Sequence, residues 1–197
     1  MGEVDALQSN TISVVILAGG QGRRVGYQQK GLLPHKGKPV IETLLEKLTP
    51  QVNNIWISVN GDMSVYKRYT EKLFTDNHSG FLGPLAGMHA AWDYLTTDWA
   101  LFVPCDNPSL PSNYVEQMLK AHSQNPAPLV VAHDGNRMQP LYLLMHRTMS
   151  SSLEKAIEKN HLSVNRWVKE NEFSQADFSE ANDNLFKNMN TLQHYDS

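Results

Sequence analysis

The sequence predicts an α/β protein, a single-domain α/β/α sandwich of three layers with a mostly parallel sheet and a Rossmann-like N-terminal half. Short apolar runs alternate along the chain with segments in which apolar residues recur at helical spacing. This alternation is typical of βαβ units, whose parallel strands are covered by helices on both faces. The first apolar run, residues 12–18, leads directly into a loop rich in glycine, at Gly19, Gly20, Gly22 and Gly26.

That first run is apolar except at Ser13 and is short enough for a strand buried on both faces of a sheet. Pro39 suits the first turn of a helix, and the apolar residues behind it repeat at helical spacing up to Leu48. The expected elements that follow are a strand at 55–59, a short polar helix at 63–69, a brief strand at 73–74, a helix at 85–95, a strand at 99–103, a helix beginning at Pro111, and strands at 129–132 and 141–145. From about Ser150 the pattern becomes helical and polar, with a last short apolar segment at 186–189.

Length and composition indicate one globular domain. The chain has 197 residues, 41% hydrophobic and 19% charged, which suits a single domain of about 100–200 residues; we place it at 12–197, behind a flexible N-terminus at 1–11. No stretch approaches the ~20 apolar residues of a membrane span, and Glu3 and Asp5 stand where a secretory signal carries positive charge. A single cysteine, Cys105, favours the reducing cytoplasm. The net charge of −3 argues against a nucleic-acid-binding surface.

The glycine-rich loop is the first candidate binding site. Glycines let the backbone approach a ligand closely and leave N–H groups for phosphate oxygens, while Arg24 and Lys30 add the charge that a triphosphate needs. The spacing lacks the Gly-Lys-Ser/Thr of a P-loop and does not match Gly-x-Gly-x-x-Gly. A purely structural turn is the competing interpretation, but the two basic residues favour phosphate binding.

Carboxylates follow two later strands. Ligands of open parallel sheets bind beyond the carboxyl ends of the strands, and Asp106 comes directly after the strand expected at 99–103. Mg²⁺ commonly uses one or two carboxylates together with substrate phosphates, so Asp106 is a candidate metal ligand, with a turn or N-cap aspartate as the alternative. Asp76 and the glycine-proline turn at 83–87 complete the set. The lone histidines follow no metal-ligand spacing, and Cys105 has no adjacent base that would make it a nucleophile.

These motifs resemble, in order and spacing, those of the molybdenum cofactor guanylyltransferases, over nearly the whole chain from Val14 to Thr191. The matching segments are Leu17-Ala18-Gly19-Gly20, Arg24-Val25-Gly26, Lys30-Gly31, Gly83-Pro84-Leu85-Ala86-Gly87 and Pro104-Cys105-Asp106. Members of the family use GTP to attach GMP to the terminal phosphate of molybdopterin, releasing pyrophosphate and giving the guanine dinucleotide cofactor. The resemblance implies a Mg²⁺-dependent nucleotidyltransferase with a nucleotide-diphospho-sugar transferase-like fold. Its implied partners are GTP, molybdopterin, other cofactor-biosynthesis proteins and acceptor molybdoenzymes.

The resemblance also implies roles for individual residues. Leu17-Ala18-Gly19-Gly20 would hold the guanine and ribose, and Arg24 with Lys30 would bind the triphosphate and offset charge on the leaving pyrophosphate. Asp76 would bind the nucleotide, and Asp106 would ligate Mg²⁺ beside the α-phosphate. Transfer of this kind needs mainly positioning and charge neutralisation. The attacking phosphate is already ionised at pH 7, so no strong general base is required.

The chain departs from the family's pattern at a few positions. Val25 replaces a methionine that is common in the glycine loop, and Gln29 replaces an acid that often precedes the lysine. The nucleotide-contacting asparagine after the second strand could be Asn60, whereas an ungapped comparison places Ser58 there. Near the C-terminus, Asn188-Met189-Asn190-Thr191 resembles the family's closing Asn-x-Asn-Thr turn, which lies toward the pterin.

Two other functions remain as alternatives. A cytidylyltransferase of the same fold would act on molybdopterin or on an isoprenoid precursor, but such relatives typically carry Leu-Ala-Ala-Gly. Position 19 is therefore the discriminating one, because a missing methyl at Gly19 would leave room for the larger purine. A non-catalytic nucleotide-sensing domain is the second alternative, and the presence of Arg24, Lys30 and Asp106 together argues against it.

Overall fold

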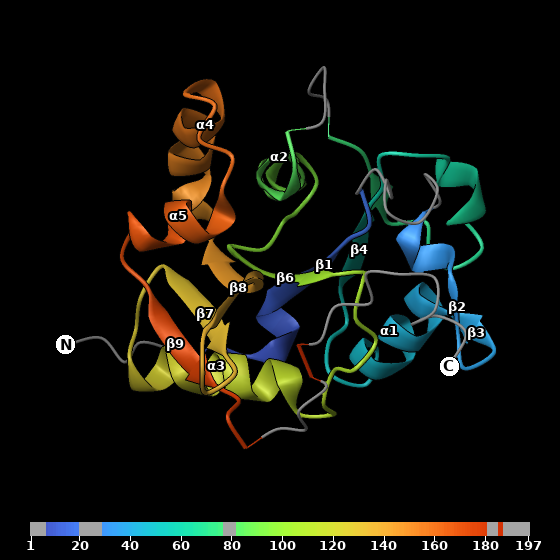
Figure 1. The fold of residues 1–197 in the computed structure, drawn as a ribbon, viewed down its shortest axis with the longest axis horizontal. Helices are drawn as coiled ribbons and strands as arrows, with labels where there is room; N and C mark the ends of the chain where they lie inside the picture. The colour runs from blue at the N-terminus through green and yellow to red at the C-terminus, as the bar shows by residue number, and fades with distance from the viewer. Residues whose placement is uncertain (1–6, 20–28, 77–81, 181–184, 187–197) are drawn as a thin grey trace.

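A central sheet of seven strands, with helices on both of its faces, forms the body of the protein (Figure 1). The computed structural model describes residues 7–19, 29–76, 82–180 and 185–186. The three-layer α/β/α sandwich and the mostly parallel sheet predicted from the sequence are confirmed. Of the N-terminal segment expected to be flexible, residues 1–6 lie outside the described residues, and Ser9–Thr11 forms a single 3₁₀ turn, η1.

The sheet and its covering helices have the following bounds. The strands of the sheet are β1 (Ile12–Leu17), β4 (Ile55–Ser58), β5 (Leu73–Phe74), β6 (Trp99–Pro104), β7 (Leu129–His133), β8 (Met138–His146) and β9 (Ser174–Asp177). The α-helices are α1 (Val40–Leu48), α2 (Pro84–Ala90), α3 (Tyr114–Gln124), α4 (Ser150–Glu158) and α5 (Val164–Lys169). A separate small hairpin pairs β2 (Pro34–His35) with β3 (Lys38–Pro39), and the short 3₁₀ helices are η3 (Lys30–Leu32), η4 (Met63–Val65), η5 (Ala91–Asp93) and η6 (Arg147–Met149).

Side chains of the central strands alternate between two hydrophobic cores. Along β1, Val14 and Ile16 join the core that α1 and α3 cover, whereas Val15 belongs to the core beneath α2, α4 and α5 (Figure 1). The strands β6, β7 and β8 divide their side chains in the same way. A strand that is buried on both faces is apolar at nearly every position, which explains the apolar runs in the sequence. Ser13 of β1 is buried as well, and its Oγ is hydrogen-bonded to Thr97 Oγ1 (2.8 Å).

The strand order β5-β4-β1-β6-β8-β7-β9 places β1 at a switch point in the topology. β1 pairs in parallel with β4 on one side and with β6 on the other. In sheets of this type the chain diverges on either side of such a strand and leaves a crevice beyond its carboxyl end. Within the seven-stranded sheet, β8 is the one described strand that runs antiparallel to its neighbours, β6 and β7.

Some sequence-based boundaries were wrong. The helix expected to begin at Pro111 begins at Tyr114, because Gln51 accepts a hydrogen bond from the Val115 N–H (2.9 Å) and also donates to the Pro111 carbonyl (3.2 Å). This side chain, which follows α1, therefore caps α3 from a distance. In place of the polar helix expected at 63–69 there is the short η4, which is followed by turns.

Two further parts of the fold bear on the sequence predictions. The strand β9, which the sequence pattern did not reveal, extends the sheet beside β7. Of the apolar segment expected at 186–189, Phe186 is described and is buried, and the other three residues lie outside the described residues. No helix in the described ranges combines the length and the apolar character needed to cross a membrane.

Candidate active site

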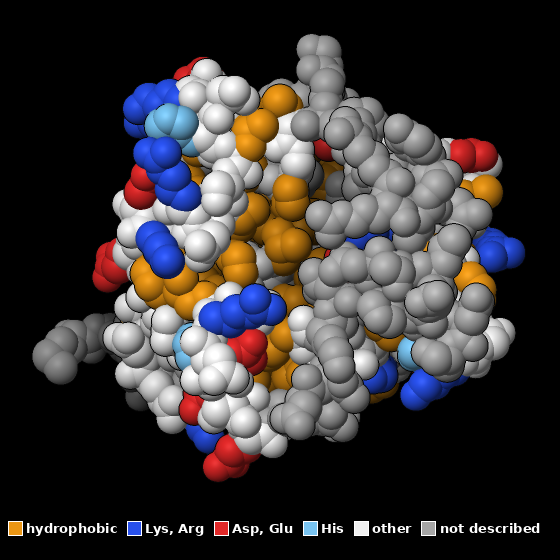
Figure 2. Space-filling model, viewed as in Figure 1, with side chains coloured by type: hydrophobic (Ala, Val, Ile, Leu, Met, Phe, Trp, Pro, Cys, Tyr) orange, Lys and Arg blue, Asp and Glu red, His pale blue; other side chains and the backbone are white. Residues whose placement is uncertain are grey.

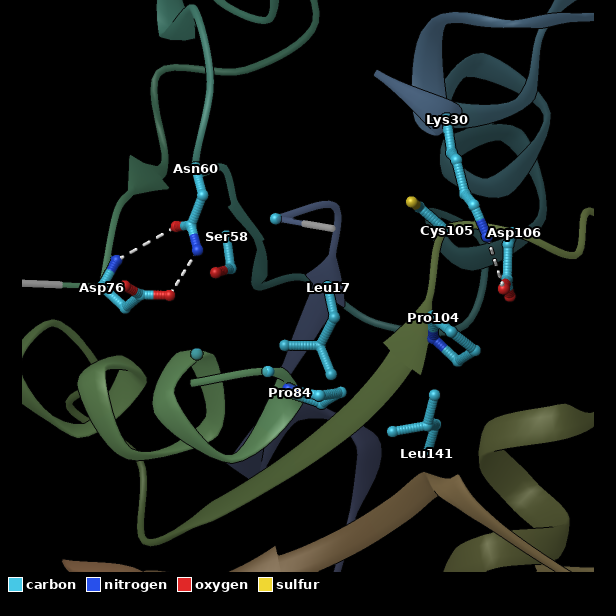
Figure 3. A pocket seen from close by; sticks show the side chains of 13 residues that line it. Leu17, Lys30, Ser58, Asn60, Asp76, Pro84, Pro104, Cys105, Asp106 and Leu141 are labelled. Carbon is cyan, nitrogen blue, oxygen red and sulfur yellow. Dashed lines mark hydrogen bonds and ion pairs between the residues drawn. The ribbon is translucent and has the colours of Figure 1, made fainter. Parts of the chain in front are cut away.

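A pocket of about 440 Å³ opens at the carboxyl ends of β1, β4, β5 and β6. It lies at the switch point where ligands of this fold class bind. Six residues proposed from the sequence line it: Leu17, Gly19, Lys30, Asn60, Asp76 and Asp106. Figure 3 shows polar side chains at two separate corners of this pocket, with an apolar floor between them.

One corner holds Lys30 and Asp106. The Lys30 Nζ lies 3.5 Å from Asp106 Oδ2, and both side chains are mostly covered, with 20% and 14% of their surfaces exposed. The second carboxylate oxygen, Asp106 Oδ1, is buried and has no hydrogen-bond partner among the described residues. A buried carboxylate oxygen without a donor is poorly compensated, so this corner is suited to receiving a cation or a donor from a ligand.

Strand pairing and a buried asparagine position Asp106. β6 ends at Pro104, which is in register with Leu17 of β1, and the next residue, Cys105, donates its N–H to the Leu17 carbonyl (3.2 Å). On the other side, the Asn107 amide donates to the Leu185 carbonyl and accepts from the Ser109 N–H (2.7 Å). The loop that carries Asp106 is thus tied both to the sheet and to the C-terminal part of the chain.

Lys30 is positioned by close packing at its neighbour Gly31. A Cβ at Gly31 would lie 2.9 Å from the hydroxyl oxygen of Tyr66 and 3.7 Å from Ile41. The Tyr66 side chain is fully buried, and burial raises the pKa of its hydroxyl well above the usual value. A side chain at position 31 would collide with Tyr66 and displace it, together with the turn η3 that carries Lys30.

The opposite corner holds Asn60 and Asp76, which follow β4 and β5. The Asn60 Nδ2 donates to Asp76 Oδ2, and the backbone N–H of Asp76 approaches Asn60 Oδ1 at 3.4 Å (Figure 3). Ser58, the alternative to Asn60, also lines the pocket. Its Oγ lies against α2, where a Cβ at Gly87 would be only 3.1 Å away. Asn60 is therefore the residue that contacts Asp76.

Apolar side chains separate the two corners. Leu17, Pro84, Pro104 and Leu141 line this part of the pocket, and Figure 2 shows hydrophobic surface in a hollow on the same face of the molecule. Cys105 also lines it, but burial raises the pKa of its thiol to about 12. The thiol is therefore protonated at neutral pH, which agrees with its interpretation from the sequence as a packing residue.

Comparison with known proteins identifies the family. Residues 14–175 match the model of the MobA-like NTP transferase domain. The chain is 40% identical over 182 residues to a molybdenum cofactor guanylyltransferase of Shewanella putrefaciens, covering 92% of this chain and 93% of the relative. It is also 40% identical over 187 residues to the protein of that name from Aliivibrio fischeri, covering 95% of both. The chain belongs to this family.

The fold agrees with a solved structure of similar description. Molybdopterin-guanine dinucleotide biosynthesis protein A from Archaeoglobus fulgidus superimposes with a TM-score of 0.77 at 22% identity, covering 93% of this chain and 95% of that one. At this identity the likeness concerns the fold alone. It places this MobA-like protein among nucleotidyltransferase-like α/β folds.

Four sequence-predicted site residues lie outside the described residues, namely Gly20, Arg24, Asn188 and Asn190. Ala18 is described but does not line the pocket. Its side chain is 4% exposed, and its N–H donates to the Ser58 carbonyl (2.8 Å). Of the proposed nucleotide ligands in the loop 17–20, the structure therefore places Leu17 and Gly19 at the pocket.

Some of the remaining pocket residues were proposed from the sequence and others were not. Leu141 lies on β8, an antiparallel strand, and no motif marks it. The Gly83-Pro84-Leu85-Ala86-Gly87 turn was part of the predicted set, and Gly83, Pro84 and Gly87 line the pocket; Gly83 has a positive φ of 74° and Pro84 begins α2. Gln29, noted as a departure from the family, does not line the pocket and packs against Gly61, where a Cβ would lie 3.0 Å from its Cδ.

Proposed function

We propose that this protein transfers GMP from GTP to molybdopterin. A terminal phosphate oxygen of molybdopterin attacks the α-phosphorus of GTP, the bond between that phosphorus and the β-phosphate oxygen breaks, and pyrophosphate leaves. The observation that carries the proposal is the 40% identity to molybdenum cofactor guanylyltransferases across more than nine-tenths of both chains. The pocket supports it, because its volume of about 440 Å³ lies between a corner with a cation and a carboxylate and a second corner with another carboxylate.

The two corners divide the work of binding the nucleotide. Asn60 and Asp76 form the base corner, where a carboxylate can accept hydrogen bonds from the N1–H and N2–H₂ groups of guanine. Lys30 forms the phosphate corner and offsets negative charge that grows on the departing pyrophosphate. Arg24 is proposed to join it, and Asn188 with Asn190 to contact the pterin; these three lie outside the described residues.

Asp106 is the proposed ligand of Mg²⁺. Its unpartnered Oδ1 fits the preference of this ion for oxygen, and the described residues contain no cluster of three potential metal-ligating side chains. The remaining ligands would therefore come from nucleotide phosphates and water, which is usual for Mg²⁺. When bound, the ion would supply positive charge that stabilises the transferring phosphoryl group.

The reaction needs no protein nucleophile or strong base. The attacking phosphate is ionised at neutral pH, and the one cysteine, Cys105, carries a protonated thiol because burial raises its pKa. Positioning and charge neutralisation are then the main contributions of the protein. A cytidylyltransferase activity is not favoured, because the relatives at 40% identity are guanylyltransferases.

The cellular setting is also part of the proposal. We place the protein in the cytoplasm, on the basis of its single cysteine, and expect it to meet other cofactor-biosynthesis proteins and acceptor molybdoenzymes. Its net charge of −3 supports small phosphorylated substrates over nucleic acid.

The activity can be tested by product identification. The purified protein is incubated with molybdopterin, Mg²⁺ and each labelled nucleoside triphosphate in turn, and the dinucleotide formed is identified. We expect a guanine dinucleotide and pyrophosphate from GTP, and loss of both when Mg²⁺ is chelated. A cytosine dinucleotide in preference, or no product with any nucleotide, would contradict the proposal.

A further inference from the structure

We propose that Asn60 is a positioning residue that orients Asp76 for base selection, and that position 19 is glycine because the Asn60 amide occupies the space beside it. The identity of the base as guanine rests on the proposed function. The mechanical coupling among Gly19, Asn60 and Asp76 rests on the structure alone.

The first observation is how the Asn60 amide is used. Its Nδ2 donates to Asp76 Oδ2, and its Oδ1 lies 3.4 Å from the backbone N–H of Asp76. Both polar atoms of the amide thus contact the same residue. Among the described residues Asp76 Oδ1 has no hydrogen-bond partner, so one edge of the carboxylate is held and the other is available to a ligand (Figure 3). This arrangement makes Asp76 the residue that contacts the base and Asn60 the residue that sets its direction.

The second observation concerns Gly19. A Cβ built on it would lie 2.9 Å from Cγ, 3.0 Å from Nδ2 and 3.3 Å from Oδ1 of Asn60. Real Cβ atoms do not approach heavy atoms this closely, so an alanine would force a movement. The φ angle of Gly19 is not positive. A larger residue at position 19 is therefore excluded by lack of space and not by the backbone conformation.

The backbone near Gly19 has little freedom to yield. Leu17 pairs with Ser58, and the Ala18 N–H donates to the Ser58 carbonyl at 2.8 Å, so the segments carrying Gly19 and Asn60 are joined within the sheet. The Asn60 amide would therefore move in response to a methyl group, and its contact with Asp76 would be lost. On the sequence alone the missing methyl was expected to make room for a purine directly. In the structure the first atoms that it would meet belong to Asn60.

A held carboxylate distinguishes bases by their hydrogen-bond donors. Guanine presents N1–H and N2–H₂ side by side, whereas inosine lacks the second donor. An Asp76 held in one orientation should therefore bind GTP more tightly than ITP. A hydrogen bond to a charged group contributes enough to change affinity by about 10-fold to 100-fold, and this is the size of the preference that Asn60 should support.

The test is a double-mutant cycle on nucleotide binding. Gly19→Ala, Asn60→Ala and the double variant are prepared in the full chain, and dissociation constants for GTP, ITP and CTP are measured by calorimetry with thermal unfolding alongside. Asn53→Ala, an exposed asparagine ahead of β4, is the matched control. We expect each single variant to lower the GTP-to-ITP preference about 10-fold or more, and the control to leave it unchanged.

The double variant decides the mechanism. With the Asn60 amide removed, the methyl at position 19 has space, so the double variant should bind no worse than Asn60→Ala alone, and the two effects should not add. Effects that add, or an unchanged preference in Asn60→Ala, would overturn the inference. If Asn60 had a purely structural role, Asn60→Ala would weaken the binding of all three nucleotides equally and would leave the GTP-to-ITP ratio unchanged. That result would also count against the inference.

The same experiment separates this inference from the proposed function. If the wild-type protein binds CTP better than GTP, the guanylyltransferase proposal is wrong. The cycle is then evaluated on CTP, where non-additive effects of Gly19→Ala and Asn60→Ala support the coupling and additive effects overturn it.

Discussion

The two ends of the central sheet use polar side chains in opposite ways. At the amino ends of the strands, Ser13 Oγ hydrogen-bonds Thr97 Oγ1 (2.8 Å) and accepts from Asn54 Nδ2, while Lys72 Nζ donates to Asn54 Oδ1 (2.6 Å). At the carboxyl ends, the Lys30–Asp106 pair is 3.5 Å apart and leaves Asp106 Oδ1 without a partner among the described residues. Polar groups at the first end bind one another, and at the second end some remain available to a ligand.

Arg147, at the amino end of the sheet, binds several partners at once. Its guanidinium donates to the carbonyls of Trp92 (3.3 Å), Leu95 and Thr97 (3.1 Å), pairs with Asp98 at 3.7 Å and lies 5.1 Å from the centre of the Trp92 ring. These hydrogen bonds join Arg147 to η5 and to the turns that follow it. By contrast, the base corner at the carboxyl end uses Asn60 to hold one oxygen of Asp76 and leaves the other without a partner in the described part of the chain. Mutations at the two ends should therefore separate stability from activity.

The largest expected effect is that of Asp106→Asn. This change removes an anionic oxygen at almost constant volume. We expect turnover to fall roughly 10³-fold, because loss of the carboxylate proposed to bind Mg²⁺ would remove several kcal/mol of transition-state stabilisation. Steady-state kinetics in saturating Mg²⁺ measures it. Asp98→Asn, at the amino end, is the matched control and should keep full activity. Near-normal turnover of Asp106→Asn would remove this residue from the metal site.

Lys30→Ala tests the same corner through its cation. We expect kcat/KM for GTP to fall about 100-fold, because a hydrogen-bonding charge at the phosphates is lost. The variant should also unfold at a somewhat lower temperature, because it leaves the mostly covered Asp106 carboxylate without its cation. Lys72→Ala removes a lysine from the amino end and should leave kcat/KM unaltered. If both lysine variants behave alike, the contrast between the two ends fails.

Arg147→Met should show the reverse pattern. Methionine retains packing over Trp92 but cannot donate to the three carbonyls, so the free energy of unfolding should fall by about 2 kcal/mol. The kinetic constants per folded molecule should not change. Urea denaturation combined with GTP titration measures both quantities. A raised KM without loss of stability would show that the amino end contributes to the site.

The smallest expected effect is a pH dependence of stability at His122. The His122 ring packs against Trp99, which also contacts His146. Burial is the largest cause that lowers the pKa of His122, and the nearby His146 lowers it further by a smaller amount. A pKa below the unfolded value means that the unfolded chain takes up the proton first. The contribution of His122 to the free energy of unfolding is therefore fully present above about pH 6.5 and declines as the pH falls below that value.

His122→Gln removes this titration. We expect the urea midpoint of the variant to fall less than that of the wild type between pH 7 and pH 5.5, with no change in activity at pH 7. An identical pH profile for both proteins would show that His122 does not contribute.

Burial explains which elements of the fold were predictable. β6 is a continuous apolar run and β1 is one interrupted only by Ser13, because both faces of each strand are covered. Burial on two faces leaves a strong pattern in the sequence. β9 reads Ser-Gln-Ala-Asp, with alternate residues exposed, and four residues of this kind resemble a loop. The start of α3 was placed wrongly because its cap, Gln51, lies far away in the sequence.

The candidate site divides in the same way. Lys30, Asp76 and Asp106 were proposed from the sequence, because each is a charged residue shortly after an apolar run or a glycine loop, and the structure brings them to one pocket. Leu141 was not, because an apolar residue on an apolar strand carries no distinguishing mark. Spacing left both Ser58 and Asn60 open as the residue that contacts the nucleotide, and both of them line the pocket.

The sequence by itself determined the layered fold, the edge of the sheet at which the pocket lies and the charged residues found there, because alternation and strand-end chemistry are properties of neighbouring residues along the chain. Only the tertiary structure decided which groups each polar side chain contacts. Asn60 meets Asp76 because β4 and β5 are adjacent in the sheet, and Gly19 meets Asn60 because β1 and β4 are. Contacts of this kind depend on distances between strands that are remote in sequence, and a linear pattern does not contain those distances.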